Sequence, residues 1–221
     1  ALVSAMLAAG LTLRDIPCGK YGTLDKYVPD GDYVVIKFAR WAFEKFKGVE
    51  DKLGTQMRAV GEVMSIGKNY KEAFQKAIRS LENGRYGLGH VKNFDTLSKE
   101  ELLKKLVTPS SERHFIMYEA LRKGATVDEI YELTKVKHYF ISQMKELVDE
   151  EEELLKFKGS LPSDELLTKA KKDGFSDKYL SLLLDVSEDD VRSRRTSLGV
   201  NEVWEGVHVS GTENNAYYYS T

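Results

Sequence analysis

The sequence predicts a mostly α-helical protein in which a helical domain follows an incomplete α/β piece. Two observations support this fold class. Residues 33–38 and 58–66 are rich in β-branched and apolar side chains, and an amphipathic helix follows the second run. From residue 98 onward, Ser or Thr capping residues and Gly or Pro stops recur at intervals of one helix length. A single strand–loop–strand–helix unit cannot close a core alone, so the α/β piece is expected to pack on further structure.

Length and composition exclude several classes of protein. The chain of 221 residues is 42% hydrophobic and 31% charged, which is typical of globular proteins. No apolar run reaches the roughly 18 residues that a membrane-spanning helix needs, and a net charge of -2 provides no positive field for nucleic acid. We therefore expect neither a membrane nor a nucleic acid as partner. The single cysteine, Cys18, cannot form an internal disulfide and fits a reducing compartment such as the cytoplasm.

The N-terminal stretch is predicted to contain little regular structure. Residues 2–9 have the pattern of the end of a buried helix that Gly10 stops. Thr12 is the predicted N-cap of a short turn at residues 13–16, and residues 18–31 form a connection that contains several Gly and Pro residues. Because no initiating Met precedes the opening apolar residues, we expect the chain to be a piece of a longer protein.

The central stretch is predicted to hold two strands and a helix. Residues 33–38 are largely apolar, which suits a strand covered on both faces, and residues 58–66 form the second strand. Asn69 is the predicted N-cap of a helix that ends before Gly84. The glycine-rich residues 85–95 are interpreted as a flexible boundary. The apolar face of the helix consists of Ala73, Phe74, Ala77, Ile78 and Leu81.

The remainder is predicted to be helical up to residue 199, because each expected helix begins and ends at residues with the appropriate capping chemistry. The predicted N-caps are Ser98, Ser111, Thr126, Ser176 and Ser187, and the stops are Pro109, Gly124, Gly174 and Gly199. Helices are expected at residues 101–107, 112–123, 127–134, 136–157 and 161–172, with two short helices after Ser176 and Ser187. Residues 203–209 are expected to be extended, and residues 214–221 to form a tail whose adjacent tyrosines need a packing partner.

No catalytic, cofactor-binding or metal-binding residue is assigned from the residue patterns. The histidines are scattered over different elements, and neither His-x-x-x-His nor Cys-x-x-Cys spacing occurs. The glycines at 84, 87 and 89 follow a helix and do not lead from a strand into one, so they do not match a phosphate-binding loop. No neighbouring base marks Cys18 as a nucleophile. The histidines are His90, His114, His138 and His208.

Helix-turn-helix DNA binding is the main alternative function on the residue patterns. Residues 124–141 have the pattern of two helices around a tight turn, and residues 175–195 repeat this rhythm. The acidic residues 149–153 and 188–190 oppose DNA binding. The first of these acidic runs is interpreted as a solvated helix face, or else as a contact for a basic partner. The candidate phosphate contacts are Arg192, Arg194 and Arg195.

One block of the sequence matches a known family over many positions. It consists of Asp32-Tyr33-Val34-Val35-x-Lys37, Arg40-Trp41-x-Phe43-Glu44-Lys45-Phe46 and Gln56-Met57-x-x-Val60-Gly61-Glu62-Val63-Met64-x-Ile66-Gly67. This block resembles the large subunit of carbamoyl phosphate synthetases, at the end of the first, carboxyphosphate-forming ATP-grasp module. Residues 121–134, 140–144 and 172–177 resemble the family's oligomerisation domain. Residues 203–208 and 216–221 resemble the linker into the second synthetase half.

The resemblance implies a domain organisation and a role. Residues 1–88 would be the C-terminal part of the ATP-grasp module, residues 89–200 the helical oligomerisation domain, and residues 201–221 the linker. The family's metal-binding and phosphate-binding loops precede the matched block and are not in this chain. The resemblance therefore implies a non-catalytic scaffold fragment that is expected to be inactive alone. A helix-turn-helix regulator with an α/β sensor piece remains the alternative.

The resemblance also implies the setting of the whole protein. The family makes carbamoyl phosphate from bicarbonate, glutamine-derived ammonia and two ATP, for pyrimidine and arginine biosynthesis in the cytoplasm. ATP and Mg or Mn, with K, would be cofactors of the whole protein and not of this fragment. The implied partners are the remainder of the large subunit, the glutamine amidotransferase small subunit and further copies of the chain.

Five residues of the matched block are candidates for a structural role. They are expected to hold the ATP-grasp sheet together or to contact neighbouring modules. The alternative for the charged ones is a set of surface salt bridges, worth about 0–1 kcal/mol each. These residues are Lys37, Arg40, Trp41, Gln56 and Glu62.

Overall fold

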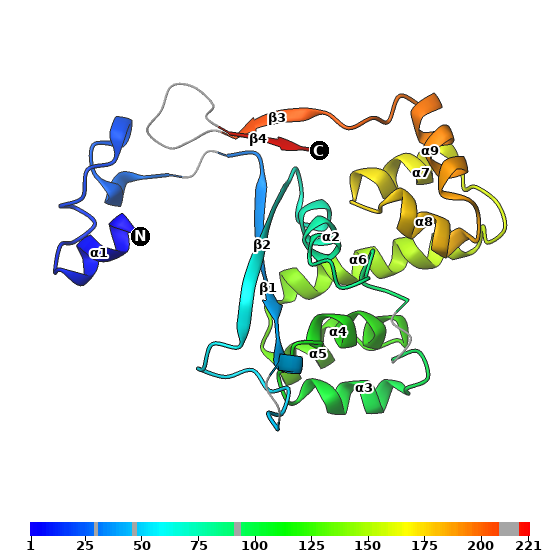
Figure 1. The fold of residues 1–221 in the computed structure, drawn as a ribbon, viewed down its shortest axis with the longest axis horizontal. Coiled ribbons are helices and arrows are strands. Elements are labelled where there is room, and N and C mark those ends of the chain that lie inside the picture. Colours follow the sequence, from blue (N-terminus) through cyan, green and yellow to red (C-terminus); the bar gives the residue numbers. More distant parts are fainter. Residues whose placement is uncertain (29–30, 46–47, 91–93, 208–216) are drawn as a thin grey trace. The chain divides into compact units, whose positions relative to one another are not determined.

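The computed structural model describes residues 1–28, 31–45, 48–90, 94–207 and 217–221 (Figure 1). The described chain divides into two compact units. Val34–Asn201 form the larger unit, and Ala1–Tyr33 with Glu202–Thr221 form the smaller one. Helices dominate and only two small sheets occur among the described residues, so the predicted mostly α class is confirmed.

The N-terminal part of the smaller unit contains the helix α1 (Leu2–Ala8) and two short 3-10 turns, η1 (Gly19–Tyr21) and η2 (Leu24–Lys26). The helix at this position is confirmed, but the prediction that it is buried is wrong. None of its residues is buried, and Leu2, Val3 and Leu7 are exposed. The predicted turn follows Thr12, but the Thr12 side chain does not cap it by accepting a backbone hydrogen bond: the backbone N–H and the hydroxyl of Thr12 both donate to the Asp15 carboxylate.

The C-terminal part of the smaller unit is a strand pair instead of the predicted tail. β3 (Trp204–Val207) pairs antiparallel with β4 (Tyr217–Ser220), with Glu205 opposite Tyr219. The pairing satisfies backbone groups, and Tyr219 is buried together with Val207, whereas Tyr217 and Tyr218 stay exposed, so the expected packing partner is found for one tyrosine of the run. The remainder of the predicted tail, residues 214–216, lies outside the described residues.

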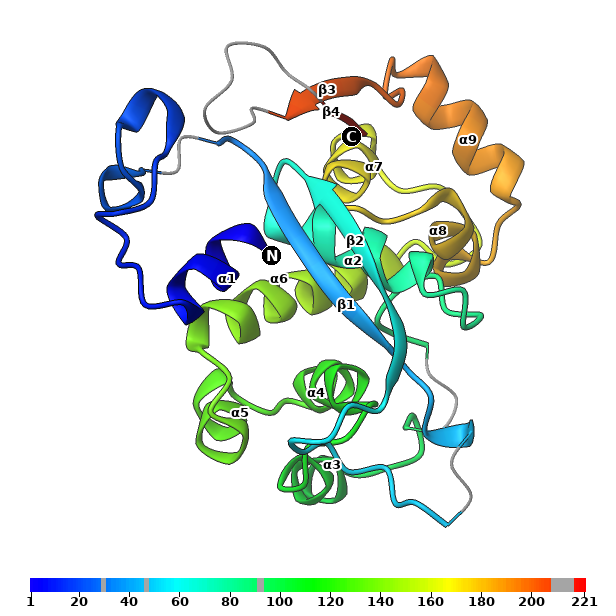
Figure 2. The ribbon, with the colours of Figure 1, turned by 60° about the vertical axis from the view of Figure 1, so that its left-hand side comes forward.

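The sheet of the larger unit is an antiparallel pair of β1 (Val34–Trp41) and β2 (Ala59–Gly67), followed by α2 (Tyr70–Ser80). The 3-10 turn η3 (Phe43–Lys45) follows β1. Both predicted strands and the Asn69 cap are confirmed. The prediction that the first strand is covered on both faces is wrong: α2 covers one face of the pair (Figure 2). Because successive side chains alternate between faces, Val35 and Met64 stay exposed while Phe38 is buried.

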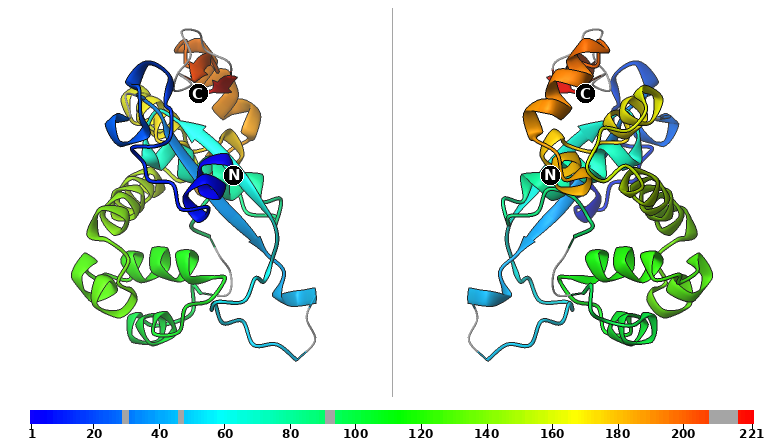
Figure 3. Two further views of the ribbon diagram at one scale, coloured as in Figure 1. Left: turned by 90° about the vertical axis from the view of Figure 1, so that its left-hand side faces the viewer. Right: turned by 90° about the vertical axis from the view of Figure 1, so that its right-hand side faces the viewer.

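Seven helices follow in the described part of the larger unit. They are α3 (Lys99–Leu106), α4 (Arg113–Arg122), α5 (Val127–Thr134), α6 (His138–Leu155), α7 (Asp164–Lys172), α8 (Asp177–Leu184) and α9 (Glu188–Ser197). The long helix α6 runs from the group formed by α3, α4 and α5 to the group formed by α7, α8 and α9 (Figure 3). One continuous apolar core includes Phe74 and Ile78 of α2 together with side chains of all seven helices. The strand-following helix therefore shares its core with the helical domain.

Most of the predicted helix starts are confirmed, because capping is a local interaction. Ser98 and Thr126 form complete capping boxes, and Ser176 and Ser187 each accept a backbone hydrogen bond from the first helical turn. The predicted Ser111 cap is wrong. The backbone N–H and the hydroxyl of Ser111 both donate to the Asp51 carboxylate, and no side chain accepts a capping hydrogen bond at the start of α4.

The two predicted helix-turn-helix segments share one backbone plan. Gly124 after α4 has φ +87°, and Gly174 after α7 has φ +94°. Each glycine precedes an N-cap hydroxyl residue by two positions, and a short helix follows. The short helices α5 and α8 both end at a residue with left-handed backbone, Lys135 and Asp185 respectively. The repeated rhythm in the sequence thus corresponds to two tight turns between packed helices.

Candidate functional site

Helix α2 is bound along its length to the turn between α7 and α8. Gln75 Nε2 donates a hydrogen bond to the backbone oxygen of Asp173 at 2.9 Å. One turn further, Arg79 Nη1 donates to the backbone oxygen of Gly174 at 3.0 Å. At the beginning of the helix, Lys71 Nζ lies 2.9 Å from Asp173 Oδ2. Gln75 and Asp173 are 98 residues apart in the sequence. The turn is therefore one of the places where the strand–helix piece and the helical domain meet.

Gly174 allows this contact because it lacks a side chain. Its φ of +94° lies in a region that L-residues with a Cβ rarely adopt. A Cβ at this position would lie 2.8 Å from the Cα atom of Glu72 and 3.1 Å from the Glu72 backbone oxygen. The turn thus approaches the backbone of α2 directly, and no rotation of a flexible side chain would make room for a methyl group.

A charged network surrounds Asp173 at the same contact. Lys71 binds Asp173 and also Glu146, whose Oε2 lies 3.1 Å from the ammonium group. Lys169 binds Glu150 and Asp173. Burial alone would raise the pKa of Asp173, but the hydrogen bond from Lys71 and further hydrogen bonds outweigh burial and lower this pKa. Burial raises the pKa of Glu150 to about 7.

A second buried carboxylate, Glu151, joins three other segments. Its Oε2 accepts hydrogen bonds from Tyr118 Oη at 2.6 Å and from Tyr179 Oη at 2.7 Å. The Gly89 N–H donates to Tyr179 Oη at 3.0 Å. Burial raises the pKa of Glu151. A Cβ on Gly89 would lie 2.5 Å from Glu151 Oε1, so Gly89 is closely packed and its interpretation as part of a flexible boundary is wrong.

The prediction that residues 149–153 form a solvated helix face is wrong for two of the five positions. Glu150 is 4% exposed and Glu151 is 0% exposed, whereas Asp149 and its other acidic neighbours point to solvent. The helical period explains the difference, because Glu151 continues the buried stripe of Ile141, Met144 and Val148. The helical period could therefore have identified the inward-facing carboxylates from the sequence. The prediction treated the five acidic residues alike because all of them are charged.

Replacing Tyr179 with Phe is expected to lower the free energy of unfolding by about 2 kcal/mol. The change leaves the buried N–H of Gly89 without its acceptor and removes one donor from Glu151. Tyr118→Phe is the matched control, because it removes only a donor and is expected to cost about 1 kcal/mol. Urea unfolding followed by far-ultraviolet circular dichroism measures both losses. Equal losses would contradict the role of the Gly89 hydrogen bond.

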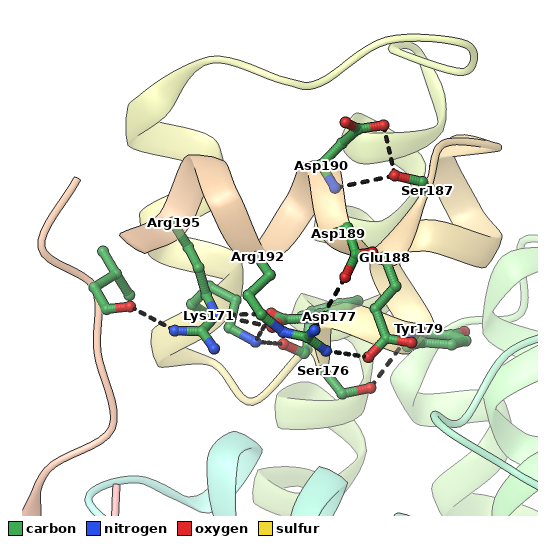
Figure 4. Close-up of polar contacts among 12 residues, drawn as sticks. Lys171, Ser176, Asp177, Tyr179, Ser187, Glu188, Asp189, Asp190, Arg192 and Arg195 are labelled. Atoms are coloured by element: carbon green, nitrogen blue, oxygen red, sulfur yellow. Dashed lines mark hydrogen bonds and ion pairs between the residues drawn. The ribbon is translucent and has the colours of Figure 1, made fainter. Parts of the chain in front are cut away.

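The arginines of α9 are bound to carboxylates, and Figure 4 shows this for Arg192 and Arg195. Asp177, at the start of α8, receives Lys171 Nζ at 2.7 Å and Arg195 Nε at 2.8 Å. Burial would raise the pKa of Asp177, but hydrogen bonds from these two cations outweigh burial and lower it. The DNA-binding alternative needs a basic face on α9, but the arginines of this helix form ion pairs with carboxylates. The carboxylate partners are Glu188 and Asp189 for Arg192, Asp164 for Arg194 and Asp177 for Arg195.

Comparison with known proteins assigns the family. A family model described as the oligomerisation domain of the carbamoyl-phosphate synthetase large chain matches residues 62–199, which is more than half of the chain. The chain belongs to this carbamoyl-phosphate synthetase family. The match begins within β2 and includes α2 and all seven later helices, so it contains the whole contact between α2 and the turn around Gly174.

Relatives match along the whole chain. The carbamoyl phosphate synthase large chain of Archaeoglobus fulgidus is 42% identical over 100% of this chain and 21% of its own length. The large chain of Clostridium botulinum is 41% identical, with 21% of its length covered. The N-terminal section of the Methanopyrus kandleri large chain is 38% identical, with 42% of its length covered. The chain thus spans about 21% of the length of the complete large chains that it matches. Nothing in these comparisons supports the DNA-binding alternative.

The five candidate structural residues of the carbamoyl-phosphate synthetase block fall into separate groups. Lys37 Nζ lies 2.5 Å from Glu62 Oε1, and their side chains are 58% and 57% exposed. Arg40 Nη1 donates to the backbone oxygen of Trp41 at 2.8 Å, where β1 ends. Gln56 accepts a hydrogen bond from a neighbouring arginine outside both strands. The structure therefore joins two pairs and leaves Gln56 apart. A role for these residues toward neighbouring modules stays a prediction.

No group of three or more His, Cys, Asp or Glu side chains in the described part of the chain is placed to hold a metal ion. None of the helices described combines the length and the apolar character that a membrane crossing requires. His208 lies outside the described residues.

Proposed function

We propose that this chain is a non-catalytic scaffold within a carbamoyl phosphate synthetase large subunit. In this role it joins the end of the first ATP-grasp module to the second synthetase half and supports association of subunits. The observation that carries the proposal is the contact of α2 with the turn around Gly174, which ties the strand pair and the helices into one core. Such a shared core suits a part that transmits position between modules. The printed description of the matching family, an oligomerisation domain, supports the same role.

The activity of the whole protein is proposed from its relatives. We propose that the complete large subunit, with a glutamine amidotransferase small subunit, makes carbamoyl phosphate from bicarbonate, glutamine-derived ammonia and ATP in the cytoplasm, for pyrimidine and arginine biosynthesis. ATP with Mg or Mn, and K, would bind elsewhere in that protein, where the metal ions neutralise charge on the transferred phosphoryl group. The division at residues 88 and 200 into ATP-grasp, oligomerisation and linker parts belongs to the same proposal.

Calorimetric titration with ATP and Mg²⁺ tests the scaffold role. The chain of 221 residues is expected to show no saturable heat of binding, whereas the complete large subunit titrated in parallel is expected to bind. Saturable one-site binding to the chain would overturn the proposal. Sedimentation velocity on the same sample tests the association part: a mass that rises with concentration is expected, and a monomer at every concentration would contradict it.

A further inference from the structure

The network at the contact between α2 and the α7–α8 turn holds more negative than positive groups. Its carboxylates are Glu146, Glu150 and Asp173, and its ammonium groups are Lys71 and Lys169. With every group ionised, three negative charges share two positive ones. Glu146 is 53% exposed, so its charge is solvated, whereas the other two carboxylates are poorly solvated: the side chain of Glu150 is 2% exposed and that of Asp173 is 10% exposed.

Glu150 is the member of the network whose charge is least well compensated. Its Oε2 binds Lys169, but its Oε1 is buried and has no hydrogen-bond partner among the described residues. Lys169 divides its charge between Glu150 and Asp173 and is itself 56% exposed. A buried carboxylate oxygen without a donor is costly when ionised and much less so when the carboxyl group is neutral. One proton on Glu150 would leave two carboxylates facing two ammonium groups.

Protonation of Glu150 is expected to affect the bonds between the turn and α2, because Asp173 takes part in both the charged network and these bonds. Asp173 binds Lys71 through its side chain and Gln75 through its backbone oxygen, and Gly174 binds Arg79 through its backbone oxygen. Ionised Glu150 competes with Asp173 for Lys169 and places a like charge beside it. The turn thus carries the carboxylate that lies beside Glu150 together with the bonds that hold α2.

We propose that Glu150, Lys169 and Asp173 form a proton-controlled clamp that holds the α7–α8 turn on α2 when Glu150 is neutral and loosens when Glu150 is ionised. The clamp would regulate how firmly the strand–helix piece is joined to the helical domain. It adds a control to the contact and does not depend on the proposed activity of the whole protein.

The direction of the effect follows from proton linkage. Burial raises the pKa of Glu150 from its ordinary value of 4.5 to about 7, and the opened turn would return it toward the ordinary value. The closed state therefore binds the proton more tightly, and opening becomes easier as pH rises through this interval. Between pH 5 and 8 the opening equilibrium is expected to rise roughly 10- to 100-fold.

A local measurement is needed, because Glu151 on the same helix also has a raised pKa and would contribute to global stability. The amide hydrogens of Gly174 and Phe175 report on the turn, since they bind the backbone oxygens of Lys171 and Ala170. Hydrogen exchange of these amides in the full chain, corrected for intrinsic exchange rates, gives the opening equilibrium at each pH.

The test compares the parent chain with Glu150→Gln and Glu153→Gln. The parent and Glu153→Gln, which changes an exposed glutamate of the same helix, are expected to lose protection roughly 10- to 100-fold from pH 5 to 8. Glu150→Gln is expected to keep constant protection. A flat parent profile, or an unchanged slope in Glu150→Gln, would overturn the clamp. If Glu150→Gln does not fold, carbon-13 titration of the Glu150 carboxyl in the parent decides: a midpoint near 7 supports the clamp, and one below 5 refutes it.

Discussion

Replacing Gly174 with Ala is expected to lower the free energy of unfolding of the larger unit by roughly 3 kcal/mol. Two costs add at this position. The backbone conformation, with φ +94°, is strained for a residue that has a Cβ, and the new methyl group would lie 2.8 Å from the Cα of Glu72. Relief of the clash requires α2 to move away from the turn, which weakens the bonds from Gln75 and Arg79. Urea unfolding monitored by circular dichroism measures the loss.

Gly124→Ala is the matched control for this prediction. Gly124 occupies the corresponding turn after α4 with φ +87°, and a Cβ there would meet nothing within 4 Å. Its replacement therefore carries the conformational cost alone, about 1 kcal/mol. Equal losses in the two variants would show that the approach of the turn to α2 contributes nothing. A larger loss for Gly174→Ala would assign the difference to the contact.

Acid is expected to destabilise the larger unit through His114. This histidine of α4 packs beside two aromatic rings, with its ring centroid 5.0 Å from that of Phe38 of β1 and 5.7 Å from that of Phe74 of α2. Burial, assisted by the charge of Arg113, lowers the pKa of His114 from 6.5 to about 4. The unfolded chain therefore binds the proton more readily than the folded one. Stability from the neutral ring is complete above pH 6.5 and decreases as pH falls toward 4, by about 3 kcal/mol.

His114→Phe tests this prediction, because it keeps an aromatic ring beside Phe38 and Phe74 and removes the titrating group. The difference in unfolding free energy between variant and parent is expected to shift in favour of the variant by about 2–3 kcal/mol from pH 7.5 to pH 4.5. Chemical denaturation at a series of pH values measures this difference, and the value at pH 7.5 gives the packing cost of the substitution. Parallel pH profiles would rule out His114 as the source of acid sensitivity.

Most elements of the larger unit were predictable from the sequence because their signals are local. The predicted helix at residues 127–134 coincides with α5, since Thr126 and Glu129 form a capping box within one turn. The two strands were recognisable by their β-branched residues, but their burial was not. The sequence does not show that α2 covers only one face of the strand pair, because this depends on how the elements pack. Ser111 is a residue type that often caps helices, but its backbone N–H and its hydroxyl both donate to Asp51, which is distant in the sequence.

The candidate site was much less predictable. Helical periodicity could have placed Glu151 on the inward face of α6, in line with Met144 and Val148. It could not have named Tyr118 and Tyr179 as the groups that bind it, because these come from two other helices.

Local sequence was sufficient for the mostly helical class and for most helix starts, since a capping hydroxyl and a stopping glycine act within one turn of backbone. Tertiary structure alone decided that Gly174 touches α2, that Glu150 lies within a charged network and that two tyrosines from other helices bind Glu151. These outcomes depend on side chains and backbone that meet from positions far apart in the chain, such as Gln75 and Asp173 at a separation of 98 residues. Capping motifs carry no information about such meetings, because the packing of the common core sets which helix faces oppose each other.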